Sequence, residues 1–340
     1  MYRIVALRRL ALATMLLTLC LVVLGAYVRL SDAGLGCPDW PGCYGHFTPS
    51  AAAAANVDLH EGKAWREMIH RYVATTVGLL CVVIAALAFL WRRQARVPLA
   101  LALLLVPLVI FQGLLGMWTV TLLLKPLIVT LHLLFGLATL SVLWWLWLSL
   151  RRLSSNPWSG TRSAQGGGST AALVRPAPVL LRRLALIALA ALMVQILLGG
   201  WTSSNYAAIA CPDFPKCQAS WWPAADYRDA FVPWRGLGVN YEGGVLAPAA
   251  RIAIHFTHRL GAVVATLLLL YAALRTLRMR PEGNSRYAAA AVLAALALQL
   301  AIGIFMVLRG FPLWLATAHN AGAALLLLAT LALNRALRRA

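Results

Sequence analysis

The chain has 340 residues, of which 61% are hydrophobic and 12% are charged. This balance excludes an ordinary soluble domain, in which about a quarter of the residues are charged. The formal net charge of +20 would suit a nucleic-acid partner, but its arginines flank apolar runs long enough to cross a bilayer, so we expect a lipid environment and no nucleic acid.

Eight apolar runs are predicted to be membrane-spanning helices. In chain order they cover residues 10–30, 68–91, 98–121, 126–150, 180–202, 251–274, 287–308 and 312–334. Basic residues before the first run are also typical of a signal peptide. The length of that run and the lack of a small-residue cleavage site favour a retained helix. The predicted fold class is an all-α polytopic membrane protein.

A cysteine motif follows the first run and returns after the fifth. Cys37 and Cys43 enclose the segment CPDWPGC, and Cys211 and Cys217 enclose CPDFPKC. Thiols outside the cytoplasmic membrane tend to be oxidised, so we predict the disulfides Cys37–Cys43 and Cys211–Cys217. Two prolines inside each loop favour a stiff structural staple. A reducible pair in a thiol-oxidising enzyme with a quinone site is the alternative.

These two segments belong to an internal duplication. Residues 24–43 align with residues 198–217 at a constant offset of 211 − 37 = 174. A His-Arg pair repeats at 258 − 70 = 188 and a Thr-x-His motif at 319 − 132 = 187. Such repeats often describe the architecture directly. They predict two tandem, pseudo-twofold-related four-helix bundles at 1–150 and 180–340, joined by a cytoplasmic linker at 151–179.

The arginines indicate the orientation in the membrane. Those before the first run, after the second, fourth and sixth runs and at the C-terminus fall on one side of an eight-span chain. The positive-inside rule makes this side cytoplasmic. We therefore expect both termini in the cytoplasm and the cysteine loops on the outer face.

Four histidines repeat between the halves as two matched pairs. His70 and His258 are expected in the first turn or so of their helices, and His132 and His319 lie a few residues into theirs. Ligating groups inside a membrane are costly and are usually functional. Imidazole is a common axial ligand of heme iron, whereas zinc usually takes more protein ligands. Each half is therefore predicted to place two imidazoles on opposite sides of a heme.

The repeat breaks beside the first histidine. Glu67 precedes His70 by three residues, and the aligned position in the second half is His255. Glu67 shares a helical face with His70, so it is a candidate for acid–base or electrostatic help in a reaction. A helix-start carboxylate favoured by the macrodipole is the alternative. His255 is a secondary candidate, as an alternative ligand or a hydrogen-bond partner near His258.

Three arginines near the outer membrane boundary are candidate partners of heme propionates. Arg29, Arg71 and Arg259 can form charge-assisted hydrogen bonds to such groups. Snorkelling to the interface explains Arg29 nearly as well. Gln112 and Gln299 lie inside apolar runs, where neutral amides bond between helices.

These motifs together resemble bacterial heme A synthase. The resemblance rests on GAYVRLSDAGLGCPDWPGCYG, EMIHR, QGLLGMWTV and the TAHN segment of the last run, and it extends in order over nearly the whole chain. The resemblance implies oxidation of the C8 methyl group of heme O to a formyl group by successive hydroxylations, which supplies heme A to cytochrome oxidase. It also implies a b-type heme in the C-terminal half and the substrate heme in the N-terminal half.

Carried over to the C-terminal half, the resemblance implies that His258 and His319 ligate heme b, with Arg259 as a neighbouring cation. The disulfide cysteines Cys211 and Cys217 are not universal among relatives. The longer third outer loop, residues 218–250, is expected to cover this second site.

Carried over to the N-terminal half, the resemblance implies that His70 and His132 hold the substrate heme. Arg71 and Arg29 are the candidate cations at this site, and Glu67 assists the reaction. Because Glu67 has no counterpart in the second half, we expect the first half to react and the second to support it.

The resemblance also implies partners and a location. These are heme O as substrate, an electron-transfer partner of unknown identity, heme O synthase or oxidase assembly factors, and the bacterial inner membrane with periplasmic cysteine loops. Two other functions remain open: a diheme b-type electron-transfer cytochrome, and a heme transporter or chaperone. The unrepeated Glu67 favours an enzyme, since a carrier would keep both sites alike.

Overall fold

A computed structural model describes residues 2–93, 97–155, 177–279 and 283–338. Within these ranges the chain is helical, and its only β-pairing is two isolated bridges in loops. Eight helices are long and apolar enough to cross a membrane. They are α1 (Tyr2–Leu30), α3 (Glu61–Leu90), α4 (Leu99–Thr121), α5 (Pro126–Ser155), α6 (Val179–Ser204), α8 (Pro248–Met279), α9 (Asn284–Leu308) and α10 (Leu313–Arg338). The predicted all-α membrane class is confirmed.

Some spanning helices begin before their predicted apolar runs. α3 begins at Glu61 and α8 at Pro248, ahead of the predicted starts at 68 and 251. The early turns of α3 carry charged side chains, so hydropathy does not detect them. The prediction that His70 and His258 lie in the first turn or so is therefore wrong. They are 70 − 61 = 9 and 258 − 248 = 10 residues into their helices, which is more than two turns.

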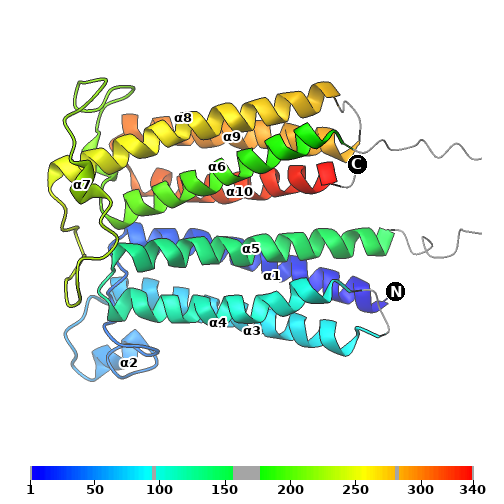
Figure 1. The fold of residues 1–340 in the computed structure, drawn as a ribbon. Helices are drawn as coiled ribbons and strands as arrows, with labels where there is room; N and C mark the ends of the chain where they lie inside the picture. Colours follow the sequence, from blue (N-terminus) through cyan, green and yellow to red (C-terminus); the bar gives the residue numbers. More distant parts are fainter. Residues whose placement is uncertain (1, 94–96, 156–176, 280–282, 339–340) are drawn as a thin grey trace, which may run out of the picture.

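Three short helical segments lie in loops at the end of the molecule opposite to the two termini, which we name the outer end (Figure 1). They are α2 (Pro49–Ala54), η1 (Ala208–Ala210) and α7 (Tyr227–Ala230). Thr48 caps α2 by accepting a hydrogen bond from the backbone N–H of Ala51, and Asp226 caps α7 in the same way. These caps satisfy N–H groups that have no partner within the helix. Figure 1 shows α2 and α7 at the end of the molecule opposite to the two termini.

Helix contacts divide the eight spans into two groups of four. In the first group, α1 and α4 each contact α3 and α5; in the second, α6 and α9 each contact α8 and α10. The groups lie side by side (Figure 1) and meet through α1 with α10, α5 with α6 and α5 with α10. This grouping follows the order that the repeat predicts, and the pseudo-twofold relation itself stays a prediction.

The predicted linker at 151–179 lies mainly outside the described residues, which stop at 155 and resume at 177. Its first residues continue α5 as far as Ser155, and Val179 begins α6. The domain boundaries at 150 and 180 therefore stay predictions.

Polar bonds join the two groups near the end where the termini lie. The guanidinium of Arg335 on α10 donates from Nη1 to the carbonyl of Trp145 and to Oγ of Ser149 on α5, both at 2.9 Å. The indole of Trp144 donates to the carbonyl of Leu328 at 3.1 Å. Lipid is as apolar as a helix surface, so burial of apolar area does little to hold helices together. Interhelical hydrogen bonds of this kind therefore help to define how the two groups pack.

Candidate functional site

The first histidine pair lies inside the first helix group. His70 on α3 and His132 on α5 have ring centroids 6.4 Å apart and ring planes at 71°. A metal ion held between two imidazole nitrogens at about 2 Å from each separates the ring centres by roughly this distance. The spacing therefore suits a single metal centre with two axial imidazoles, as in a heme.

The second pair lies inside the second group. His258 on α8 and His319 on α10 lie near one another within it. In the described part of the chain, no three His, Cys, Asp or Glu side chains gather as a metal site. Each half therefore offers two imidazoles, the number of axial ligands that a heme iron takes. All four histidines keep part of their surface accessible.

Each of the four imidazoles lies against a glycine of a neighbouring helix. The pairs are Gly25 with His70, Gly116 with His132, Gly199 with His258 and Gly303 with His319. A Cβ atom at these glycines would lie only 2.9 to 3.3 Å from Cε1 of the ring. A larger residue would therefore push the ring away from its neighbouring helix.

These glycines were not identified as site residues from the sequence, although a signal was present. They repeat at 199 − 25 = 174 and 303 − 116 = 187, the same offsets that relate the cysteine loops and two of the histidines. Glycine at matched positions of a repeat indicates a close approach in both halves.

The first site leaves its imidazole nitrogens without amide partners. Gln112 on α4 donates from Nε2 to the backbone carbonyl of His132 at 2.9 Å, which joins the two helices as the sequence predicts. Among the described residues, Nδ1 of His70 and Nδ1 of His132 have no hydrogen-bond partner.

The second site differs, because two amides approach its imidazole rings. Nε2 of Gln195 on α6 lies 3.1 Å from Nδ1 of His258. Nε2 of Gln299 on α9 lies 3.3 Å from Nδ1 of His319. The sequence predicts that Gln299 bonds between helices. It did not identify Gln195 as a site residue, although a lone amide inside an apolar run was an available signal.

Glu67 is the only buried carboxylate among the described residues, with 4% of its surface exposed. Oε1 pairs with Nη2 of Arg71 at 2.5 Å, and Oε2 accepts a hydrogen bond from the backbone N–H of Cys37 at 2.9 Å. The macrodipole acts within the first turn of a helix. α3 begins at Glu61, so Glu67 lies beyond that turn. The helix-start explanation is therefore excluded. Oε2 joins α3 to the first cysteine loop, and Oε1 holds Arg71, which also bonds that loop.

His255 occupies the corresponding place in the second half. Its Nε2 accepts a hydrogen bond from Nε of Arg259 at 3.2 Å, as Glu67 accepts one from Arg71. The ring is buried and meets Phe311 edge-on, with centroids 6.1 Å apart. These contacts favour a structural partner of Arg259 over a further metal ligand.

Both predicted disulfides are present. Cys37 and Cys43 are joined in the first outer loop, and Cys211 and Cys217 in the third. Each second cysteine forms an antiparallel bridge to a residue three positions later, His46 or Ser220. The two loops thus have matching backbone pairing, as expected for structural staples of a repeat.

An aspartate inside each staple fastens its turn. The carboxylate of Asp39 accepts hydrogen bonds from the backbone N–H groups of Tyr44 at 2.6 Å and Gly45 at 2.7 Å. Burial alone would raise the pKa of Asp39, but these donors outweigh it and lower the pKa. Asp213 is placed in the same way and accepts from Gln218. Both loops therefore keep an ionised carboxylate at neutral pH.

Two of the three candidate arginines hold the staples to their helices. Arg71 donates to backbone carbonyls of the first loop, including that of Asp39 at 2.8 Å. Arg259 donates to the carbonyls of Lys216 at 2.7 Å and Cys211 at 2.8 Å. The structure thus gives both side chains a role in the loops, and their role as propionate partners stays a prediction.

Arg29 lies at the junction of the two halves. Nη2 donates to the carbonyls of Ser203 at 2.9 Å and Ser204 at 3.3 Å, at the end of α6. The guanidinium also lies 4.0 Å from the ring centre of Tyr206. Ser203 is the repeat equivalent of Arg29 itself, since 29 + 174 = 203. Arg29 therefore connects the equivalent helix ends of the two halves.

This placement predicts that Arg29→Ala destabilises the junction. We expect a loss of roughly 1.5–3 kcal/mol, the usual contribution of hydrogen bonds from charged donors. Thermal unfolding in detergent measures the effect, with the exposed Arg92→Ala as control. Unchanged stability together with weakened heme O binding would instead favour the propionate role.

The third outer loop reaches across to the first half. Lys125, between α4 and α5, donates to the carbonyl of Gly236 and lies 3.2 Å from the ring centre of Trp234. The backbone N–H of Tyr241 donates to the carbonyl of Leu123 at 3.1 Å. The loop was expected over the second site, but this part of it binds the outer end of the first group.

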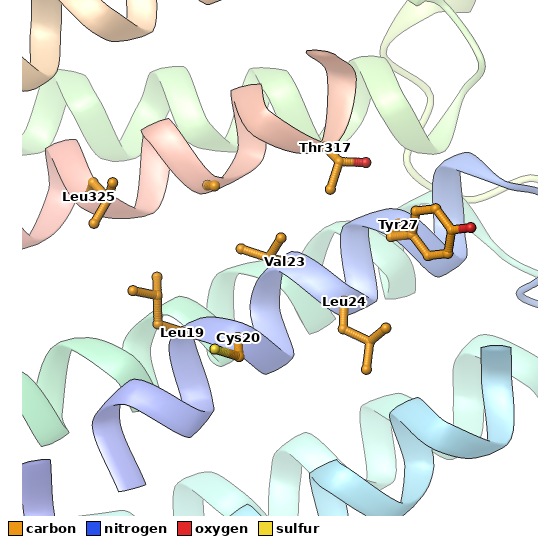
Figure 2. Close-up of a pocket in the computed structure, with 8 residues that line it drawn as sticks. Leu19, Cys20, Val23, Leu24, Tyr27, Thr317 and Leu325 are labelled. Carbon is orange, nitrogen blue, oxygen red and sulfur yellow. The ribbon is translucent and has the colours of Figure 1, made fainter. Parts of the chain in front are cut away.

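An apolar groove of about 530 Å³ lies between α1 and α10, at the seam of the two halves. Figure 2 shows its lining, with Leu19 on α1 facing Leu325 on α10 across the gap. None of the four histidines lines it. Leu24, which does, is next to Gly25, the glycine against His70. The groove is therefore a lateral hydrophobic surface beside the first site.

Comparison with known proteins agrees with this arrangement. A family model described as cytochrome oxidase assembly protein matches residues 8–331. A relative from Shewanella oneidensis named heme A synthase is 41% identical over 330 residues, which cover 94% of this chain and 93% of the relative.

The chain belongs to the heme A synthase family. Two further members, from Rhizorhabdus wittichii and Nitrosospira multiformis, are each 28% identical and cover 93% and 95% of this chain and 89% and 91% of their own lengths. The predicted family is confirmed. The chain is accordingly a multi-pass membrane oxidoreductase of heme A biosynthesis.

Proposed function

We propose that this protein converts heme O to heme A by oxidising the C8 methyl group of the porphyrin to a formyl group. The observation that carries the proposal is the pair of imidazoles at 6.4 Å between centroids, repeated as a second pair in a chain of this family. Two sites in one chain suit an enzyme that keeps one heme and processes another.

The residues around both pairs fit a heme. Each site supplies two imidazoles on different helices, and each ring lies against a glycine. We assign heme b to His258 and His319, because amides approach both rings and such partners stabilise a ligated imidazole. When bound there, heme b supplies one-electron redox chemistry.

The first site is assigned to the substrate. His70 and His132 ligate the iron of heme O and orient its ring, and Glu67 lies one turn before His70 on the same face of α3. We propose that Glu67 accepts protons as the methyl group is oxidised. The methyl group takes an oxygen atom from water to become a hydroxymethyl group, with the loss of two electrons and two protons. The hydroxymethyl group then loses two more electrons and two more protons to become a formyl group. The electrons leave to an electron-accepting partner.

The proposed location is the bacterial inner membrane, with both termini in the cytoplasm. The arginine distribution and the oxidised cysteine pairs support this orientation. Both termini lie at one end of the molecule and the cysteine loops are at the other (Figure 1). Heme O is lipophilic through its isoprenoid tail, so lateral entry between helices suits it. A neighbouring heme O synthase or oxidase assembly factor would supply or receive the heme.

Heme extraction tests the proposed activity. Cells that contain a heme O source and this protein should accumulate heme A and its hydroxylated intermediate, whereas His132→Ala should yield neither. A folded, heme-loaded protein that leaves heme O unchanged would contradict the proposal and favour an electron-transfer cytochrome.

A further inference from the structure

We propose that Gln195 is a positioning residue for His258. Its amide fits in the space beside Gly261, and this arrangement makes the C-terminal site the one that retains its heme. The inference rests on the proposed assignment of heme b to this half. Gln195 lies on α6, one turn before Gly199, which contacts the same ring. Nε2 of Gln195 is 3.1 Å from Nδ1 of His258 and 3.0 Å from its backbone carbonyl.

Gly261 provides the space for this amide. It lies three residues after His258 on α8, and a Cβ atom there would collide with Oε1 of Gln195. The same atom would lie 2.9 Å from Cδ1 of Leu198. Any larger residue at this position would therefore displace the amide from the imidazole.

The first half has neither component. The repeat equivalent of Gln195 is Leu21, since 195 − 174 = 21, and that of Gly261 is Val73, since 261 − 188 = 73. Leucine offers no hydrogen bond, and valine occupies the volume that glycine leaves free. The two positions thus differ together between the halves, and Nδ1 of His70 has no partner among the described residues.

Ligand chemistry explains what the amide contributes. An imidazole that binds iron through Nε2 carries its proton on Nδ1. A side-chain amide exchanges its oxygen and nitrogen by a half-turn, so Gln195 can present Oε1 to that proton. Oε1 is otherwise buried without a partner in the described part of the chain. Such a bond orients the ring and strengthens its donation to the metal.

The difference between the halves matches two kinds of occupancy. A resident cofactor benefits from imidazoles held in one orientation, because each fixed ligand slows heme loss. A substrate heme must leave after oxidation, and its imidazoles lack these partners. Gln195 and Gly261 therefore distinguish the second site from the first, although the four histidines and the glycines against their rings match between the halves.

The test uses the full-length, heme-loaded protein. Gln195→Leu, which introduces the residue of the first half, should release heme b to a heme-scavenging protein about 10–100 times faster, the usual effect of losing a partner of a metal ligand. It should also raise the midpoint potential of heme b. Gln195→Glu should lower that potential, because a carboxylate withdraws the Nδ1 proton more strongly.

Two further variants complete the design. Gly261→Ala should reproduce the higher potential, since it displaces the same amide. Gln112→Leu removes an amide that bonds the backbone of His132 and should leave heme b unchanged. Parental potentials and release rates in the Gln195 and Gly261 variants would overturn the inference. Heme A formation by the parent protein tests the proposed function separately.

Discussion

Replacing His258 or His319 with alanine is expected to abolish the stable b-type heme and to reduce heme A formation to background. An axial imidazole is the main covalent hold of the protein on a heme iron. The site has no third ligating side chain within the described residues to replace it. The visible absorption spectrum of the purified protein measures the loss.

Two controls separate ligand loss from misfolding. The exposed loop residue His60 serves as a matched histidine, and His60→Ala should keep the full spectrum. Added imidazole should restore part of the heme absorption in the alanine variants, since it can occupy the vacated ligand position. A spectrum that survives both substitutions would refute the assignment of this pair.

The first pair should behave differently. His70→Ala should keep heme b but lose conversion of heme O, because its ring serves the other site. Loss of heme b in this variant would contradict the proposal that heme b and the substrate heme bind in separate halves.

Glu67→Gln is expected to reduce conversion of heme O by about 10²–10⁴-fold, the usual contribution of general acid–base catalysis. The content of heme b should stay near that of the parent, because the variant changes the other half. Glutamine keeps an acceptor for the backbone N–H of Cys37 and removes the proton-accepting carboxylate. Heme A, its hydroxylated intermediate and heme b are measured in the same extracts.

The structure also suggests how Glu67 could fail this test. Its two oxygens hold Arg71 and the first cysteine loop, so it can act as an anchor alone. Glu67→His introduces the residue of the second half, where His255 bonds Arg259. Full conversion in Glu67→His, or equal loss of heme b and conversion in Glu67→Gln, would assign Glu67 to loop structure. Glu61→Gln, at the exposed start of α3, is the matched control.

Much of the architecture was predictable because its signals are local or repeated. Apolar runs near the length of a bilayer crossing predict spans without knowledge of their neighbours. The cysteine loops close over a short stretch of chain, so their pairing follows from spacing and compartment. The four histidines repeat with these elements, which identified candidate ligands before their geometry was known.

The arginines show where such reasoning stops. The sequence predicts that Arg29, Arg71 and Arg259 lie near the outer membrane boundary. In the structure their donors meet backbone carbonyls of loops and of the other half. A carbonyl partner has no signature in the sequence, because every residue carries one. The helix-start interpretation of Glu67 was wrong for a different reason. It depended on the first residue of α3, which hydropathy places too late.

The sequence by itself determined the eight spans, the duplication, the two disulfides and the histidines that form each pair. Only the tertiary structure decided which groups surround those histidines: the glycines against their rings, the bonds of Glu67, and the amide of Gln195 beside Gly261. These contacts join helices far apart in the chain and depend on how each helix is rotated about its axis. Hydropathy constrains that rotation weakly where lipid and protein interior are equally apolar.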